Sequence, residues 1–227
     1  MKMILFIHSY KNKIIFYKLY KLKSKMTTFL SIGENCCVKH QIDKHKGSKE
    51  TLFFDWLGTD MNSVISILET MDINKILFFD NIFRDSTKPN SKDGKNARVN
   101  IKSLTKCVFV HDLPIIIKDQ DVYEFIEKYK RRFQRIIDYI KRKEKIIFLR
   151  YGSITDVEKN KFIEVIQKIN PQCNFVLVSI KIEQNETQNK KEDFFLEINL
   201  TNKNQPNDWE KNFLNWKQIF ADIEEHG

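Results

Sequence analysis

The chain has 227 residues, a formal net charge of +9 and 41% hydrophobic residues, so it is long enough for one domain with a substantial core. No apolar stretch reaches the roughly 20 residues of a transmembrane helix, and the sequence therefore predicts no membrane span. The four cysteines, at positions 36, 37, 107 and 173, show neither a CxxC pair nor zinc-finger spacing. This argues against a structural zinc and favours reduced thiols in a cytoplasmic compartment.

The positive charge is concentrated at the start of the chain. Residues 1–25 contain seven lysines and no acidic residue, and without them the net charge falls from +9 to +2. The remainder is nearly balanced, which argues against nucleic acid as a partner. We expect residues 1–25 to be a disordered or non-native extension, with a basic amphipathic helix on a membrane surface as the alternative. Residues 26–227 are expected to form a single α/β domain.

Hydrophobic patterning divides the first half of the chain into short elements. It predicts a buried strand over 29–32 and a helix over 37–46 that ends at Gly47. An aromatic run over 51–57 follows, and then a helix over 62–71 with Asn62 as its N-cap. Residues 75–83 are compatible with a strand or a helix, residues 85–97 form a predicted surface loop, and residues 107–111 form a predicted strand.

In the second half of the chain, predicted strands and helices alternate more regularly. Its longest helix is predicted over 121–143, where apolar residues recur at steps of three and four. A strand over 145–150, a helix over 155–169 capped by Thr155 or Asp156, and a strand over 174–180 follow. A polar loop over 183–191, a strand over 194–200 and a helix over 209–223 complete the pattern. This alternation predicts an α/β fold in three layers, with a largely parallel sheet flanked by helices.

Two further expectations concern the surfaces of these helices. Lysines and arginines between 128 and 135 form a basic stripe, which is expected to be a solvated helix face because the aromatic residues between them follow core spacing. Trp209 and Trp216 are seven residues apart and are expected to pack the last helix on the sheet, with a sugar-stacking platform as the alternative.

A cysteine stands at the junction of the first predicted strand and the first predicted helix. Cys36 follows Gly33 by three residues and directly precedes the helix, where unpaired backbone N–H groups and the helix dipole stabilise a thiolate. Cys36 is therefore the candidate nucleophile, with a small core residue as the alternative. Asn35 and the N–H of Cys36 or Cys37 are candidates for an oxyanion hole. The side chain of Cys37 is expected to point into the core.

A histidine ends the strand predicted over 107–111. His111 is the candidate general base that would take the thiol proton, with a hydrogen-bonded loop histidine as the alternative. Asp112 is one candidate to orient the imidazole, although neighbouring residues on a strand point to opposite faces. Asp55 is the rival candidate, because a carboxylate inside the apolar run Phe54-Asp55-Trp56 needs a partner when it is buried. A structural hydrogen bond is the alternative role of Asp55.

Gly33, Arg150 and Trp56 are the candidate ligand-binding residues. Gly33 follows the first predicted strand and Arg150 ends another, where a guanidinium can bind phosphate or carboxylate. The alternative for Arg150 is an ion pair with Asp55 or Asp112. The chain contains neither GxGxxG nor a P-loop, so no cofactor is predicted. No metal site is predicted either.

Several short motifs occur in an order that resembles a known family. They are Gly33-x-x-Cys36, Phe54-Asp55-Trp56, Phe109-x-His111-Asp112, Lys130-Arg131-Arg132-Phe133 and Phe148-Leu149-Arg150. This order resembles the DUF1796 family of proposed papain-like cysteine peptidases, which occurs in bacteria and large DNA viruses. The resemblance runs from about Thr28 to the C-terminal tryptophans, and Phe53 stands where the family usually has proline. It implies a cysteine peptidase acting on a protein or a small-molecule substrate, in the host cytoplasm if the protein is viral.

Two other functions remain compatible with the sequence. A Rossmann-like transferase or hydrolase acting on a sugar or nucleotide would use Gly33 and Arg150 as an anion site. A non-catalytic interaction domain would use the same motifs only to fold. The order of cysteine before histidine favours the hydrolase. The strand that precedes the cysteine helix disfavours the usual papain layout, in which that helix precedes the sheet.

Overall fold

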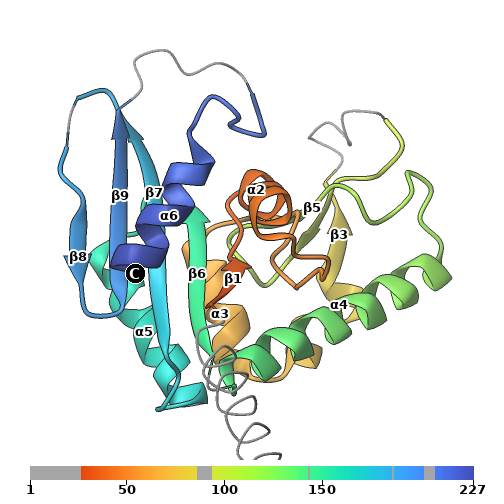
Figure 1. The fold of residues 1–227 in the computed structure, drawn as a ribbon. Helices are drawn as coiled ribbons and strands as arrows, with labels where there is room; N and C mark the ends of the chain where they lie inside the picture. Colours follow the sequence, from red (N-terminus) through yellow and green to blue (C-terminus); the bar gives the residue numbers. More distant parts are fainter. Residues whose placement is uncertain (1–26, 86–93, 143, 186, 202–207) are drawn as a thin grey trace, which may run out of the picture.

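A five-stranded sheet forms the centre of the computed structural model, which describes residues 27–85, 94–142, 144–185, 187–201 and 208–227 (Figure 1). The strand order is β1-β6-β7-β9-β8. All neighbouring pairs are parallel except β8 with β9, so the prediction of a largely parallel sheet is confirmed. The strands are β1 (Thr27–Ser31), β6 (Lys145–Tyr151), β7 (Phe175–Glu183), β8 (Lys190–Glu192) and β9 (Phe195–Thr201).

Helices cover both faces of this sheet, because side chains of successive strand residues point to opposite sides. The helices α2 (Cys37–Lys46) and α6 (Trp216–His226) lie on one face (Figure 1). Phe29 and Ile147 pack with them. Leu30 and Phe148 belong to the larger core on the other face. That core includes α3 (Met61–Thr70), α4 (Asp119–Ile140) and α5 (Asp156–Ile169). The predicted three-layer arrangement is therefore confirmed.

The helix boundaries show which local signals decide where a helix begins. α2 starts and ends where predicted, and Gly47 terminates it in the left-handed conformation at φ 67°. Thr155 caps α5 by accepting a hydrogen bond from the N–H of Glu158. The prediction that Asn62 caps α3 is wrong, since the Asp60 carboxylate accepts from the N–H of Ser63 at 2.8 Å. None of the helices in the described part of the chain is long and apolar enough to cross a membrane.

A second, antiparallel sheet was not predicted, although one of its strands overlaps the strand predicted over 107–111; that strand ends at Phe109, so the prediction that His111 ends it is wrong. The sheet consists of β2 (Gly58–Thr59), β5 (Cys107–Phe109), β4 (Val99–Ile101) and β3 (Ile82–Arg84), in that order. The segment over 75–83, which the sequence left open, contains the end of one short 3-10 helix, η1 (Ile73–Lys75), all of a second, η2 (Phe79–Asn81), and the first two residues of β3. The predicted extension over 1–25, and residues 86–93 of the predicted loop over 85–97, lie outside the described residues.

Candidate active site

The structure places Cys36 beside His111. The Cys36 Sγ lies 4.0 Å from Nε2 of His111, although the two residues are 75 positions apart in the sequence. Cys36 is the N-cap of α2, just beyond β1, whereas His111 lies in the turn that follows β5. The parallel sheet thus supplies the thiol and the antiparallel sheet supplies the imidazole. Such distances are often longer without substrate and shorten when the substrate binds.

Both side chains line a cavity of about 760 Å³. This volume lies in the range of typical small-molecule and cofactor sites. Two tryptophans give the walls an apolar surface, and two basic side chains add positive charge. The lining consists of Asn35, Cys36, Trp56, His111, Asp112, Arg132, Trp209 and Lys211.

Trp209 occupies a different place from the one predicted. Helix α6 begins at Trp216 and is capped by Asn215, so Trp209 precedes the helix instead of packing it on the sheet. Its side chain is 50% exposed, and its ring lies 5.3 Å from that of His40 in an edge contact. Trp216, by contrast, is buried on the sheet as expected. Sequence periodicity could not separate the two, because both fit one continuous helical pattern.

The backbone around the cavity adopts several left-handed conformations. Gly33 and Glu34, which precede Cys36, have φ values of 82° and 71°. Trp56 and Lys211, which line the cavity, have φ values of 67° and 55°. Residues other than glycine rarely occupy this region, and such positions concentrate at functional sites. The strained backbone therefore coincides with the cavity that holds the thiol.

Arg150 anchors the loop that carries Cys36. Its guanidinium donates to the carbonyl oxygens of Ile32, at 3.1 Å, and Thr59, at 3.0 Å, and to the carboxylate of Glu34. Arg150 is only 3% exposed, and its carboxylate partner is Glu34 in place of the predicted Asp55 or Asp112. Gly33 packs against the side chain of Thr59. Gly33 and Arg150 thus connect the two sheets and lie outside the lining of the cavity.

Burial dominates the electrostatics of the two adjacent thiols. It raises the pKa of Cys36 above its ordinary value, whereas the backbone N–H of Cys36 acts in the opposite direction. Burial also raises the pKa of Cys37 to about 12, and that side chain points into the core as predicted. The N–H of Cys37 donates to Oδ1 of Asn35 at 3.0 Å, so this candidate oxyanion donor already has a partner.

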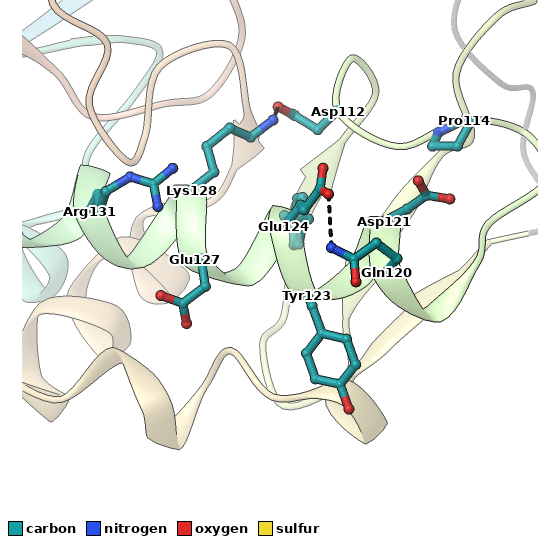
Figure 2. A pocket seen from close by; sticks show the side chains of 10 residues that line it. Asp112, Pro114, Gln120, Asp121, Tyr123, Glu124, Glu127, Lys128 and Arg131 are labelled. Carbon is teal, nitrogen blue, oxygen red and sulfur yellow. Dashed lines mark hydrogen bonds and ion pairs between the residues drawn. The ribbon is translucent and has the colours of Figure 1, made fainter.

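Asp112 is held by the helix beneath it. Its carboxylate accepts from Nζ of Lys128 at 2.7 Å and from the hydroxyl of Tyr129 at 2.9 Å, and Arg132 lies 3.9 Å away. All three partners belong to α4, and Figure 2 shows Lys128 extending from that helix toward Asp112. The carboxylate therefore fixes the turn that carries His111 on α4, which differs from the predicted role of orienting the imidazole directly.

Asp55 lies in a separate buried cluster. Its side chain is 1% exposed, accepts from the N–H of Leu52 at 2.8 Å and lies 3.3 Å from Nζ of Lys39. Lys39 belongs to α2, so the pair attaches the segment before Trp56 to the helix that begins beside Cys36. This geometry corresponds to the structural alternative for Asp55. Within the described residues, no group of three or more His, Cys, Asp or Glu side chains is arranged to hold a metal ion.

The buried carboxyl group of Asp55 predicts a measurable dependence of stability on pH. Burial raises its pKa to about 6 despite the opposing effect of Lys39. The folded state therefore binds the proton more tightly than the unfolded state, and this group costs stability as the pH rises from about 4 to about 6. The free energy of unfolding of Asp55→Asn, minus that of the wild type, should increase by about 2–3 kcal/mol between pH 4 and pH 7. Urea unfolding at several pH values measures this difference, and a constant or falling difference would contradict it.

Comparison with known proteins identifies the family to which the chain belongs. Residues 27–185 match the family described as "Putative papain-like cysteine peptidase (DUF1796)". The "Uncharacterized protein R408" of Acanthamoeba polyphaga mimivirus is 26% identical over 220 residues, which cover 86% of this chain and 98% of that protein. No solved structure matches the chain significantly. The family match includes Cys36, His111 and the elements from β1 to β7, and we conclude that the chain belongs to the DUF1796 family.

Proposed function

We propose that the protein is a cysteine-nucleophile hydrolase, with Cys36 as nucleophile and His111 as general base. The observation that carries the proposal is the 4.0 Å separation of Sγ and Nε2 inside a cavity large enough for a substrate. A thiol and an imidazole in this relation form the basic unit of cysteine-nucleophile catalysis. The description of the family as papain-like cysteine peptidases supports a peptide bond as the target.

The proposed reaction has two steps. In the first, Nε2 of His111 takes the proton of Cys36, the thiolate attacks the carbonyl carbon of the substrate, and His111 returns the proton to the leaving amine. In the second, His111 takes a proton from water, which attacks the thioester, and the acid product leaves as Cys36 regains its proton. Because burial raises the pKa of Cys36, a base beside the thiol is required at neutral pH.

Asn35 is the candidate for stabilising the negative charge that develops on the substrate oxygen. Its Oδ1 is bound to the N–H of Cys37, which leaves Nδ2 as the donor end of the side chain. Asn35 lines the same cavity as Cys36, which supports its amide as a donor to the oxygen of the tetrahedral intermediate. Asp112 acts as a positioning residue, since it holds the turn of His111 through Lys128 and Tyr129.

The alternative of a sugar or nucleotide enzyme has less support. It relied on an anion site formed by Gly33 and Arg150, but the guanidinium of Arg150 is engaged by Ile32, Thr59 and Glu34. A phosphate would have to displace the Glu34 carboxylate from a side chain that is 3% exposed. Glu34 therefore already occupies the position at Arg150 that an anionic ligand would take.

A peptide library tests the proposed function. The full chain is incubated with a library of proteome-derived peptides, and new peptide ends are identified by mass spectrometry. Cleavage by the wild type that disappears in both Cys36→Ala and His111→Ala would support the hydrolase. Cys37→Ala serves as the matched control. The thiol of Cys37 is next to Cys36 in the sequence but is fully buried, so this variant should still cleave the peptides. Cleavage that persists in Cys36→Ala, or no cleavage by the wild type, would contradict a peptidase.

A further inference from the structure

A basic groove runs along α4 next to the candidate active site. Five cationic side chains line it, four from α4 and one from the segment after α2, together with the carboxylate of Glu50. The cations are Lys49, Lys128, Arg131, Arg132 and Arg135, and the volume of the groove is about 470 Å³. Positions 128, 131, 132 and 135 share one side of the helix because they differ by three, four and seven residues.

The groove adjoins the cavity that contains the thiol. Arg132 lines both, with its guanidinium 4.7 Å above the ring of Tyr129 and 3.9 Å from Asp112. Lys128 lines the groove and donates to Asp112, which also lines the cavity. A ligand that extends beyond the cavity on this side therefore meets Arg132 first and the other cations of the groove after it.

The groove carries more positive charge than the protein itself neutralises. Lys128 and Arg132 share Asp112, and Arg135 lies 3.4 Å from Glu50. Within the described part of the chain, Arg131 and Lys49 have no carboxylate partner among the ion pairs. Five cations thus face two carboxylates, which leaves a local surplus that the nearly balanced remainder of the domain does not share.

The other end of α4 has the opposite charge. Its N-terminal turns present Asp121, Glu124 and Glu127 around a neighbouring pocket, which Lys128 and Arg131 also line where it meets the groove. Figure 2 shows Asp121 and Glu124 farther along the helix than Arg131. An acidic ligand would be repelled there and attracted toward Arg135. The charge pattern along α4 therefore sets one direction for an extended acidic ligand, from the thiol toward Lys49 and Arg135.

We propose that this groove binds an acidic stretch of the polypeptide that the enzyme cleaves, a specificity that rests on the proposed hydrolase function. From Lys128 to Arg135 the helix rises about 10 Å, which matches about three residues of an extended peptide. Aspartate or glutamate residues within a few positions of the scissile bond would reach the cations. Among the described residues, the groove lining includes no aromatic side chain for base stacking and does include a carboxylate, which favours a peptide over nucleic acid.

Binding to a catalytically inactive protein tests this inference without any turnover. Fluorescence anisotropy of a labelled hexaglutamate peptide is measured with the full-length Cys36→Ala variant at low salt. The peptide should bind, and binding should weaken as salt is added. Reversing the two unpaired cations, Lys49→Glu with Arg131→Glu, should weaken binding by at least about tenfold. The matched control, Lys141→Glu with Lys168→Glu, has the same change of net charge on exposed positions outside the groove and should stay within about twofold of the parent.

Three outcomes would overturn the inference. The first is that the parent does not bind hexaglutamate. The second is that both double variants weaken binding equally, which would show that binding depends on the net charge of the protein and not on the groove. The third is stronger competition by a thymidine oligonucleotide of equal charge than by unlabelled hexaglutamate, which would assign the groove to nucleic acid. Because the measurement uses Cys36→Ala, its result does not depend on whether the wild type cleaves peptides. The experiment can therefore reject the proposed peptide-binding role of the groove without rejecting the proposed hydrolase function, and the reverse also holds.

Discussion

Replacing His111 by alanine is expected to slow alkylation of Cys36 by iodoacetamide at pH 7 by about ten- to a thousandfold, because a neighbouring opposite charge lowers a thiol pKa by roughly one to three units. The imidazole nitrogen lies 4.0 Å from the sulfur. Burial raises the pKa of Cys36, so without the imidazole nearly all of the thiol is protonated at pH 7. The rate in His111→Ala should rise about tenfold for each pH unit up to pH 9, whereas the wild type should level off at lower pH.

The other histidine near the cavity provides the control. His40 lies on α2 beside Trp209, with its Nε2 3.6 Å from the carboxylate of Glu210. His40→Ala removes an imidazole from the same region and should leave the alkylation rate within about twofold of the wild type. Cys36→Ser identifies the modified residue, since the other three cysteines are buried. Equal pH profiles for the wild type and His111→Ala would show that the two side chains do not form a catalytic pair.

The elements with long hydrophobic repeats could be predicted from the sequence. α4 extends over 22 residues, and its buried positions follow the steps of three and four on which its prediction depended. Of the antiparallel sheet only β5 was predicted, within the strand expected over 107–111, whereas β2, β3 and β4 were not, because they contain only two or three residues. A strand this short carries no readable period of two, and it is defined only by its hydrogen-bonded neighbours. This missed sheet is the one that brings His111 to Cys36.

Some residues of the candidate site could likewise be predicted from the sequence, and others could not. Cys36 could be identified because it lies between an apolar strand pattern and a helix pattern, and His111 because it ends an apolar strand pattern. Arg132, Trp209 and Lys211 were not predicted as cavity residues, since each sits in a pattern that also describes an ordinary helix face. Arg150 was identified as important, but its partner was not, because Glu34 reaches it only through the left-handed turn at Gly33 and Glu34. Such contacts depend on backbone geometry that no local pattern encodes.

Replacing Gly33 by alanine is expected to destabilise the protein by about 2–4 kcal/mol, the combined cost of a left-handed alanine and of overpacking. A Cβ atom at Gly33 would lie 1.7 Å from Oγ1 of Thr59, so the loop or β2 would have to move. The loop is also held by the N–H of Glu34, which donates to the same oxygen at 3.3 Å. Movement would therefore disturb the turn that presents Cys36. Urea unfolding measures the loss.

Gly47 separates the two contributions to that cost. It has φ 67°, and a Cβ built there meets nothing within 4 Å, so Gly47→Ala reports the left-handed conformation alone and should cost about 1 kcal/mol. Thr59→Ala removes the oxygen that a Cβ at Gly33 would strike, and Gly33→Ala should cost less in that background than in the wild type. If Gly33→Ala and Gly47→Ala were equally destabilising, the packing of Gly33 on Thr59 would not be what joins the nucleophile loop to the second sheet. The position of Cys36 would then depend on the polar contacts that connect this loop to the second sheet, namely those of Arg150, the hydrogen bond from the N–H of Glu34 to Thr59, and the ion pair of Glu34 with Lys106.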